Sequence, residues 1–248
     1  MSSIEDKQKR EIEFWRDSPR ESPQSNSVLN IINKMSDAAI LYDCIQMFKN
    51  RINPTGKTLE LGGGQGWGSC LFKRLFPKSF VIATDISQFA IESLPKWEYH
   101  WRVNIDKSYP CKSYETAEPD SSIHNLFCFA SAHHFLAHRR TLREISRILA
   151  PGGTAFYFYE PVTPKYLYRV SFRRVNRRRP AVPEDVLITQ KIKELALETG
   201  LKPEIHYYPS HVKRGPKETL YFTILRTFPF LQNILPATAN IIFTPNGE

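Results

Sequence analysis

The 248-residue sequence predicts an α/β fold, in which a doubly wound, mostly parallel sheet carries helices on both faces. Three observations support this class. Short apolar segments alternate with segments of helical periodicity along most of the chain. The first apolar segment leads directly into a glycine-rich loop, and the second ends in an aspartate. Alternating strands and helices need crossover connections, which make neighbouring strands parallel.

The beginning of the chain differs in character from the rest. Residues 1–27 are polar and contain two prolines, so we expect them to form a flexible lead-in. From Val28 onward apolar residues recur at helical spacing, which predicts an amphipathic helix over 28–49. The sequence shows no internal repeat and no clear domain boundary. Residues 28–248 are therefore predicted to form a single domain.

Strands and helices alternate beyond that first helix. Pro151–Gly153 ends one predicted helix before the next strand, and Pro183 and Gly200 bracket a later one. The predicted strands cover residues 58–61, 80–84, 99–103, 126–130, 154–159, 204–208 and 240–243. The predicted helices cover residues 69–76, 87–94, 140–149 and 184–199.

Composition is that of an ordinary globular protein, with 41% hydrophobic and 24% charged residues. The net charge of +9 favours anionic partners such as phosphates or nucleotides. No apolar run approaches the ~20 residues that span a bilayer, and the first residues do not resemble a signal peptide. We therefore expect a cytoplasmic protein with free thiols. The spacing of the four cysteines matches no zinc pattern, and the sequence predicts no metal site.

The strongest local feature is the glycine-rich segment after the first predicted strand. Gly62, Gly64 and Gly66 alternate behind the acidic Glu60 and precede a helix. Glycine has no Cβ and tolerates positive φ, so a ligand can lie directly against this backbone. The helix start that follows offers unpaired N–H groups to a carboxylate.

Two other glycine-rich loops do not fit this segment. A dinucleotide-binding GxGxxG loop would need glycine where Trp67 or Ser69 stands. A P-loop would need glycine at Arg51, and the Gly56–Thr58 segment that imitates its end precedes the strand. A glycine-rich turn without a ligand is the remaining alternative.

An acidic residue ends the second predicted strand. Asp85 follows that strand, 19 residues after Gly66. A carboxylate in this position can accept hydrogen bonds from two ribose hydroxyls. Asp85 could instead cap the helix that follows, but its combination with the glycine loop favours the ribose role.

The ExGxGxG pattern resembles the first motif of class I S-adenosylmethionine (SAM)-dependent methyltransferases, in particular small-molecule enzymes of methyltransferase types 11 and 12. Leu149–Gly153 resembles a frequent Leu-x-Pro-Gly-Gly signature of that family, and the resemblance extends over residues 58–160. It implies a Rossmann-like, seven-stranded sheet, SAM as the methyl donor and S-adenosylhomocysteine (SAH) as a product.

The resemblance also implies a set of cofactor-binding residues. The glycines would pass under the methionine part of SAM, Glu60 would orient the loop or contact the amino group, and Ile86 would lie beside the adenine. Either Asn104 or Asp106 would accept the adenine amino group. The implied set is Glu60, Gly62, Gly63, Gly64, Gly66, Asp85, Ile86, Asn104, Ile105, Asp106 and Ala130.

Two adjacent histidines follow the fourth predicted strand. His133 and His134 stand where family members often carry a His-His or Leu-His pair. A hydroxyl acceptor benefits from a general base, and histidine suits that role near neutral pH. We expect one of the two to deprotonate the acceptor. The alternative is that they only cap or pack the following helix.

The acceptor is expected to lie near an insertion at residues 161–185. Glu160 ends the fifth predicted strand and is a candidate for lining the acceptor pocket. Arginines in the insertion can bind phosphates through two parallel hydrogen bonds, although a solvated basic connector is the simpler interpretation. The candidates are Arg173, Arg174, Arg177, Arg178 and Arg179.

These features favour a small-molecule acceptor, either a sugar or a phosphorylated or nucleotide-linked metabolite. RNA methylation is the second possibility, since the charge is positive, but the sequence contains no separate RNA-binding module. A non-catalytic SAM-binding regulator or partner subunit is the third. The apolar segment at residues 228–236 could cover the pocket, pack on the sheet, or contact a membrane or a second subunit in a homodimer.

Overall fold

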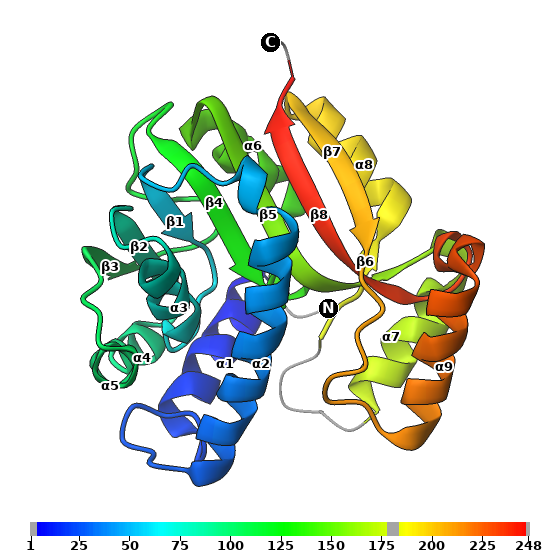
Figure 1. The fold of residues 1–248 in the computed structure, drawn as a ribbon, viewed down its shortest axis with the longest axis horizontal. Coiled ribbons are helices and arrows are strands. Elements are labelled where there is room, and N and C mark those ends of the chain that lie inside the picture. Colours follow the sequence, from blue (N-terminus) through cyan, green and yellow to red (C-terminus); the bar gives the residue numbers. More distant parts are fainter. Residues whose placement is uncertain (1–3, 178–183, 247–248) are drawn as a thin grey trace.

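The computed structural model describes residues 4–177 and 184–246, which form one mixed, mostly parallel sheet flanked by helices (Figure 1). Seven strands follow the order β3-β2-β1-β4-β5-β8-β7, and the short β6 pairs with β5. The predicted fold class is therefore confirmed. The strands are β1 (Thr58–Glu60), β2 (Val81–Asp85), β3 (Lys107–Pro110), β4 (Ile123–Phe129), β5 (Leu149–Thr163), β6 (Leu187–Ile188), β7 (Leu201–Tyr207) and β8 (Ala237–Pro245).

The first five strands run parallel, and β8 enters antiparallel between β5 and β7. Thr58 of β1 pairs with Val81 of β2 on one side and with Asn125 of β4 on the other. The carboxyl ends of β1, β2, β4 and β5 therefore meet at one edge of the sheet. In sheets of this kind the ligand lies outside that edge, where the strand order reverses.

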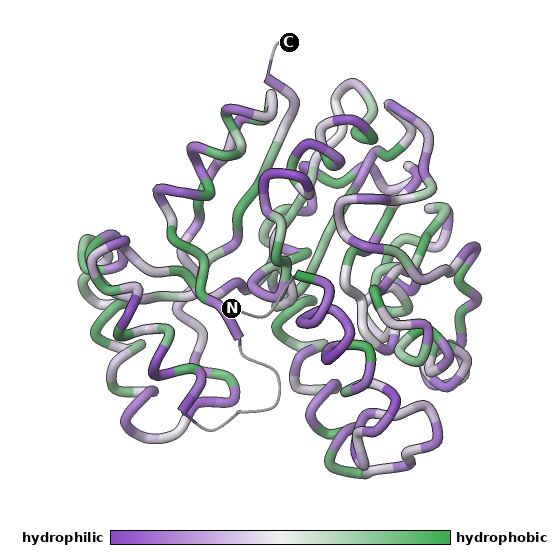
Figure 2. The backbone as a smooth tube through the Cα atoms, turned by 180° about the vertical axis from the view of Figure 1, so that it is seen from behind, coloured by the Kyte–Doolittle hydropathy of each residue, from purple (hydrophilic) through white to green (hydrophobic). Residues whose placement is uncertain are grey.

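Two hydrophobic clusters cover the two faces of the sheet. Leu59, Ile82 and Leu126 point to the face covered by α6 and α8, whereas Val81 and Phe127 point to the face covered by α2, α3 and α5. This alternation is the period-two pattern of strands that are buried on both faces. Figure 2 shows the hydrophobic segments along the central strands, with hydrophilic segments in the outer helices.

Two of the helices that the sequence did not predict, α7 and α9, lie side by side beyond one end of the sheet (Figure 1). No helix among the described residues is both long and apolar enough to cross a bilayer. The helices are α1 (Ile4–Asp17), α2 (Val28–Met47), α3 (Trp67–Leu75), α4 (Gln88–Ile91), α5 (Leu94–Trp101), α6 (His138–Ile148), α7 (Tyr168–Asn176), α8 (Thr189–Glu198) and α9 (Pro216–Thr227), with short 3₁₀ turns η1 (Lys49–Arg51), η2 (Ala132–His134), η3 (Lys165–Leu167) and η4 (Pro229–Asn233).

The expectation of a flexible lead-in is wrong for residues 4–17, which form α1. The sequence of this helix is rich in Glu, Lys, Gln and Arg, all good helix formers, with Glu5 and Asp6 in the first turn and Arg16 in the last. That signal was available in the sequence. The segment nevertheless lacks a broad apolar face, and no residue of α1 is fully buried.

The predicted third strand at residues 99–103 is also wrong. The segment from Leu94 to Trp101 is helix α5, with Pro95 in its first turn, and Arg102 ends it at a positive φ of 52°. The aromatic residues that suggested a strand lie on this helix, and Tyr99 is 82% exposed. Proline near a helix start outweighs the weak β preference of an aromatic run. The true third strand, β3, lies further along the chain and pairs with β2.

The helix predicted at residues 184–199 begins later than expected. Leu187 and Ile188 pair with Val162 and Thr163 at the end of β5 before α8 starts at Thr189. This pairing depends on the length of β5, which continues to Thr163 and beyond the predicted end of that strand. Such a long-range pairing leaves no local signal in the sequence.

Candidate active site

The glycine loop leaves β1 with three residues in the left-handed region. The φ angles are 64° at Gly62, 55° at Gly64 and 81° at Gly66. Side chains other than glycine strain the backbone in this region, so the alternating glycines have a conformational cause. Gly66 caps the start of α3, and the loop therefore turns its backbone toward the carboxyl edge of the sheet.

Glu60 lies beneath the loop and ties it to α3. Its carboxylate accepts hydrogen bonds from the Ser69 backbone N–H at 2.8 Å and from the Ser69 hydroxyl. A Cβ at Gly63 would lie 2.7 Å from the Glu60 carboxylate, so this glycine is needed to make room for the acid. Burial raises the pKa of Glu60 to about 7. Of the two roles proposed for Glu60, this geometry favours orienting the loop.

The structure brings Asp85 directly against the glycine loop. One carboxylate oxygen of Asp85 accepts the Gly64 N–H at 2.9 Å, and the other accepts the Ser87 N–H at 2.9 Å. The side chain lies at the end of β2, and burial raises its pKa to about 6. A carboxylate has about four acceptor sites, so Asp85 can still accept a ligand hydroxyl beside its backbone hydrogen bonds.

A cavity of about 550 Å³ opens beside Asp85, at the end of β3. Ile86 lines it, as do Ile12 of α1 and Pro110. The Cys111 N–H donates to the Asp85 carbonyl at 2.8 Å and thereby joins the cavity wall to the acid. Residues 109–111 are not among the predicted site residues, because the third strand is predicted too early in the chain. The remaining lining residues are Gln8, Tyr109, Cys111, Lys112, Glu115, Thr116 and Ala117.

Asn104, Ile105 and Asp106 do not lie at this site. Asp106 accepts hydrogen bonds from the Val81 N–H at 2.8 Å and from the Lys73 ammonium at 2.7 Å. Val81 begins β2, so these residues lie at the amino edge of the sheet, opposite Asp85. The geometry contradicts the expected adenine contacts. The error follows from the misplaced third strand, because residues that precede a parallel strand lie at its wrong end.

Helix α1 packs over the glycine loop. A Cβ at Gly64 would lie 3.0 Å from the Trp15 ring, and the Gln8 amide donates to the Tyr114 hydroxyl at 3.1 Å. The Glu11 carboxylate lies 3.8 Å from Nδ1 of His134. Burial and the nearby Asp85 charge raise the pKa of Glu11 to about 7. A segment expected to be a lead-in therefore supplies one wall of the site.

The β4 end carries backbone strain where the histidines begin. Ala130 has a positive φ of 45°, and Tyr159 on the neighbouring β5 has a φ of 57°. Non-glycine residues in this region cost of order 1–3 kcal/mol, and such residues cluster at functional sites. The Ser131 hydroxyl donates to the Leu61 carbonyl at 3.3 Å, which joins this segment to the glycine loop.

His133 is held by the buried carboxylate of Glu160. Nδ1 of His133 lies 2.9 Å from the Glu160 carboxylate, which also accepts the His133 backbone N–H at 3.1 Å. The same carboxylate accepts the Ser131 and Ala132 N–H groups at 2.9 and 2.8 Å. Because a carboxylate only accepts, the His133 hydrogen lies on Nδ1, and Nε2 keeps its lone pair.

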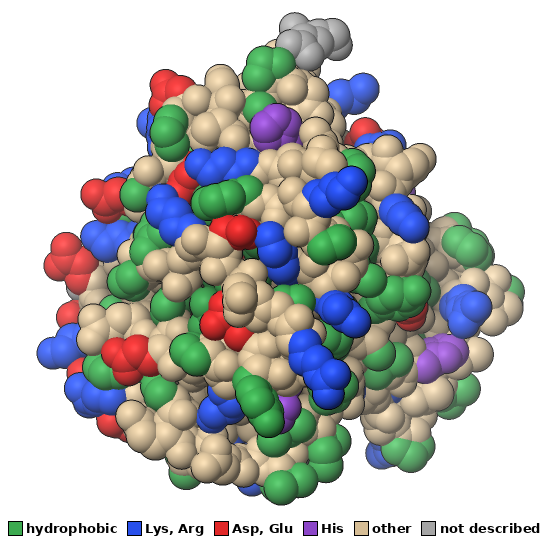
Figure 3. Space-filling model, turned by 60° about the vertical axis from the view of Figure 1, so that its left-hand side comes forward, with side chains coloured by type: hydrophobic (Ala, Val, Ile, Leu, Met, Phe, Trp, Pro, Cys, Tyr) green, Lys and Arg blue, Asp and Glu red, His purple; other side chains and the backbone are tan. Residues whose placement is uncertain are grey.

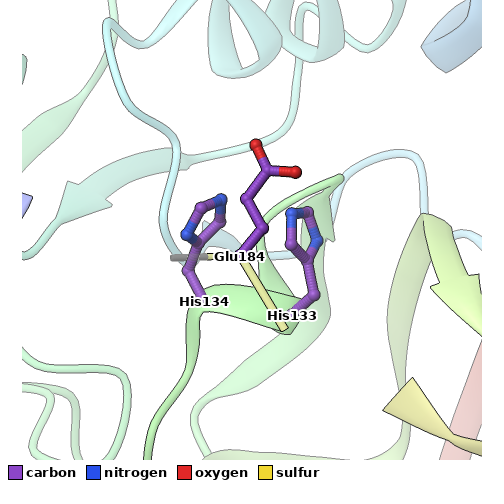
Figure 4. A group of neighbouring side chains, drawn as sticks. All are labelled: His133, His134 and Glu184. Atoms are coloured by element: carbon purple, nitrogen blue, oxygen red, sulfur yellow. The ribbon is translucent and has the colours of Figure 1, made fainter. Parts of the chain in front are cut away.

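His134 and Glu184 complete a cluster with His133 (Figure 4). Ligand atoms of the three side chains lie within 4.8 Å of one another, and both imidazole rings point toward the Glu184 carboxylate. This is the arrangement among the described residues that could hold a metal ion, and it involves none of the cysteines whose spacing the sequence prediction considered. Helix α6, strand β5 and helix α7 separate the histidines from Glu184 along the chain, so no motif reveals the cluster.

Of the arginines in the predicted acceptor region, Arg173 and Arg174 lie on α7, and Arg177 directly follows this helix. Arg174 pairs with Glu218 of α9 at 3.1 Å, while Arg173 and Arg177 are exposed. Arg178 and Arg179 lie outside the described residues. On the face that Figure 3 shows, Lys and Arg side chains are dispersed among acidic and apolar ones. That face offers no continuous basic track of the kind that follows a nucleic-acid backbone.

Residues 59–157 match the family model described as methyltransferase domain. That match spans the strands and helices from β1 to β5, together with the glycine loop, Asp85 and the two histidines. Among curated protein sequences, none matches this chain.

Several solved structures share the fold. Geranyl diphosphate C-methyltransferase from Streptomyces coelicolor has a TM-score of 0.69 at 13% identity, with 98% of this chain and 100% of that chain covered. Phosphoethanolamine N-methyltransferase 2 from Haemonchus contortus has a TM-score of 0.65 at 14% identity, with coverage of 95% and 60%. The YcgJ protein from Bacillus subtilis has a TM-score of 0.62 at 17% identity, with coverage of 85% and 99%. At these identities the likeness shows the fold alone.

Proposed function

We propose that this chain, a class I SAM-dependent methyltransferase, transfers the methyl group to a small anionic metabolite that binds beside His133. The observation that carries the proposal is the contact between the glycine loop and Asp85, where the Gly64 N–H donates to the carboxylate at 2.9 Å. Bare backbone and a carboxylate meet there at the carboxyl edge of the sheet. This combination suits an adenosyl ligand that also carries a methionine part.

The position of the cofactor follows from the neighbours of that contact. The methionine part would cross the backbone of Gly62–Gly66, and the ribose hydroxyls would donate to Asp85. The adenine would enter the cavity lined by Ile86 and Pro110. Ala130 would border the cofactor on the β4 side, since its segment is joined to the loop through Ser131.

The electrostatics of the pocket also support a cationic cofactor. Burial raises the pKa values of Glu11, Glu60 and Asp85, so the folded chain places three acids where charge is costly. SAM has a positive sulfonium and a net positive charge. Its binding would offset the cost of ionising these acids, whereas a dinucleotide with its phosphates would increase it.

The His133–Glu160 pair supports the role of general base. Methyl transfer is an in-line displacement, and much of its acceleration comes from holding acceptor and methyl group in line. The acceptor's lone pair attacks the methyl carbon, the C–S bond breaks and SAH leaves, while the acceptor's proton passes to Nε2 of His133. Glu160 fixes the ring and stabilises the imidazolium that forms. His134 lies beside it, with ring centroids 4.3 Å apart.

An anionic acceptor is supported by the helices beyond the β5 end. Exposed Arg173 on α7 and Arg177 at its C-terminal end can contact a phosphate, and α7 packs beside α9 through the Arg174–Glu218 pair. Two proteins of the same fold are named for phosphate-bearing compounds, geranyl diphosphate and phosphoethanolamine. A sugar phosphate or a nucleotide-linked metabolite fits this chemistry.

The test is to incubate the purified chain with methyl-labelled SAM and fractionated metabolite extract. We expect label to appear in small anionic compounds and SAH to accumulate in equal amount. Label in RNA instead would contradict the proposed acceptor. Absence of transfer to every fraction, with SAM bound, would contradict the enzymatic proposal and favour a SAM-binding regulator.

A further inference from the structure

The cluster of His133, His134 and Glu184 has the composition of a transition-metal site. The two histidines come from η2, at the end of β4, and Glu184 comes from the segment before β6. Imidazole and carboxylate are the ligands of the common two-histidine, one-glutamate zinc sites. Their mixture of nitrogen and oxygen atoms suits zinc and its first-row neighbours better than magnesium or calcium.

The spacing of the cluster is close to what a metal ion requires. Zinc binds nitrogen and carboxylate oxygen about 2.0–2.2 Å away, so tetrahedral ligand atoms are separated by roughly 3.3 Å. The three ligand atoms here all lie within 4.8 Å of one another. Rotation of the side chains that moves the ligand atoms by about an ångström would close that difference. Both rings already point toward the Glu184 carboxylate (Figure 4).

Each histidine of the cluster has a carboxylate on its Nδ1 side. Glu160 lies 2.9 Å from Nδ1 of His133, and Glu11 lies 3.8 Å from Nδ1 of His134. Metal-binding histidines commonly donate one ring N–H to a carboxylate, which fixes the tautomer and makes the other nitrogen a better ligand. A simple hydrogen bond between one of the histidines and Glu184 would not need Glu160 and Glu11 at the Nδ1 atoms of the two rings.

The cluster is buried at one end and reaches solvent at the other. The His133 side chain is 9% exposed and Glu160 is fully buried, whereas the His134 side chain is 28% exposed. A cation can therefore enter past His134 and stop at a firmly held imidazole. The Glu160 carboxylate, which accepts three backbone N–H groups as well as Nδ1 of His133, cannot move to take the cation itself.

We propose that His133, His134 and Glu184 bind one divalent transition-metal ion of the zinc class. Three protein ligands would leave a coordination position free for a fourth ligand. The inference rests on the proposed function in this one respect: a heteroatom of the acceptor is the natural fourth ligand. A bound cation would lower the pKa of such a group, and His133 would then serve as a ligand of the cation, whereas in the metal-free protein it would take the proton itself.

The test uses the untagged full chain after removal of metals with a chelator. Co²⁺ is the probe, because it enters zinc sites and gives visible absorption bands that report tetrahedral nitrogen and oxygen ligands. We expect one Co²⁺ per chain, displaced by one equivalent of Zn²⁺. Glu184→Gln is the main variant, because Glu184 lies in a partly exposed segment and its replacement leaves the core intact.

We expect Glu184→Gln and His134→Asn to lose the absorption bands. Glu160 is a positioning residue for His133, so Glu160→Gln should weaken Co²⁺ binding about 10–100-fold. His100→Asn, an exposed histidine on α5, is the matched control and keeps the bands. Thermal melting confirms that each variant is folded. Absence of bands in the parent chain, or bands that survive Glu184→Gln and His134→Asn alike, would overturn the proposal.

SAM calorimetry on the same samples separates this inference from the proposed function. SAM binding and methyl transfer without Co²⁺ binding would remove the metal site and leave the methyltransferase proposal intact. Co²⁺ binding by a chain that ignores SAM would do the reverse.

Discussion

The cofactor side and the acceptor side of the proposed site are assembled in different ways. On the cofactor side, Glu60, the glycine loop and Asp85 belong to one strand–loop–helix–strand unit, and the contact between Gly64 and Asp85 is made within it. On the acceptor side, His133 needs Glu160 from β5. Glu11, which lies beside His134, and Glu184 come from segments far before and far after the histidines in the chain. A local unit leaves a motif in the sequence. A site assembled from distant segments does not.

The two sides also differ in what specifies them. Backbone conformation specifies the cofactor side, because only glycine suits the left-handed positions of its loop. Contacts between side chains specify the acceptor side. Any histidine that the fold brings near a carboxylate could make such a contact. Substitutions on one side should therefore leave the function of the other intact, and the following predictions depend on that separation.

The largest effect is expected at His133. Alanine at this position removes the proposed base, and turnover at saturating SAM should fall about 10²–10⁴-fold while SAM affinity is kept. The comparison variant His100→Ala, exposed on α5, should keep both. The measurement is label transfer to the acceptor identified in the extract screen, with SAM affinity by calorimetry. Full turnover in His133→Ala would show that the histidine is structural.

A smaller loss, on the cofactor side, is expected for Gly64→Ala. The residue has a φ of 55°, and the methyl group would meet Trp15 and the proposed path of the ligand. SAM affinity should fall about a hundredfold, or roughly 3 kcal/mol. Gly152→Ala is the matched control, since Gly152 has a φ of 68° and open space around it. Both variants should lose stability, roughly 1–2 kcal/mol from backbone strain. Equal SAM affinity in the two would separate the loop from the cofactor.

The cofactor side could be predicted from the sequence better than the acceptor side. Gly62–Gly66 and Asp85 could be predicted because each has a local cause, positive φ or the end of a buried strand. Residues 104–106 were wrongly assigned because one aromatic segment was interpreted as a strand instead of α5. The strand itself, Lys107–Pro110, is mostly exposed and lacks an apolar run, so only its pairing with β2 identifies it.

The acceptor side is harder to predict from the sequence. The sequence indicates His133 and Glu160 as separate candidates, but their contact depends on the pairing of β4 with β5, which is a tertiary property. Helix α1 could have been predicted from its composition. Its position over the glycine loop could not, because only tertiary contacts such as that of Trp15 with Gly64 establish it.

The pH dependence of SAM binding offers a third test, with an effect of up to tenfold per pH unit. Asp85 has a pKa of about 6 in the folded chain, above its ordinary value of 3.8, so it holds a proton below pH 6. The ribose hydroxyls and the sulfonium cation of SAM interact better with ionised Asp85 than with its protonated form. Where Asp85 holds a proton, SAM binding must therefore release it. The contribution of Asp85 to the affinity should be level above about pH 7, and the affinity should weaken as the pH falls below 6. Calorimetry in buffers of different ionisation enthalpy measures the protons released.

A pH profile that is flat from 5 to 8 would contradict a direct role of Asp85. Asp85→Asn serves as the control, because its amide does not titrate in this range and its residual affinity should not depend on this proton.

The smallest effect is expected for the exposed arginines on and directly after α7. Arg173→Glu and Arg177→Glu should each raise the KM for an anionic acceptor about fivefold, close to 1 kcal/mol, with the difference shrinking at high salt. Lys202→Glu, on β7 and away from the carboxyl edge, makes the same charge change as a control. An unchanged KM in both arginine variants would assign α7 to a solvated surface.

Calorimetric titration of the purified chain with SAM, SAH and NAD⁺ tests the central claim most directly, because it needs no acceptor. We predict one site per chain for SAM and for SAH, with affinity in the micromolar range, about −8 kcal/mol, and no heat of binding for NAD⁺. A folded chain that takes up NAD⁺ as readily as SAM, or that shows no heat with millimolar SAM, would contradict the claim that the glycine loop and Asp85 form an adenosyl-sulfonium pocket.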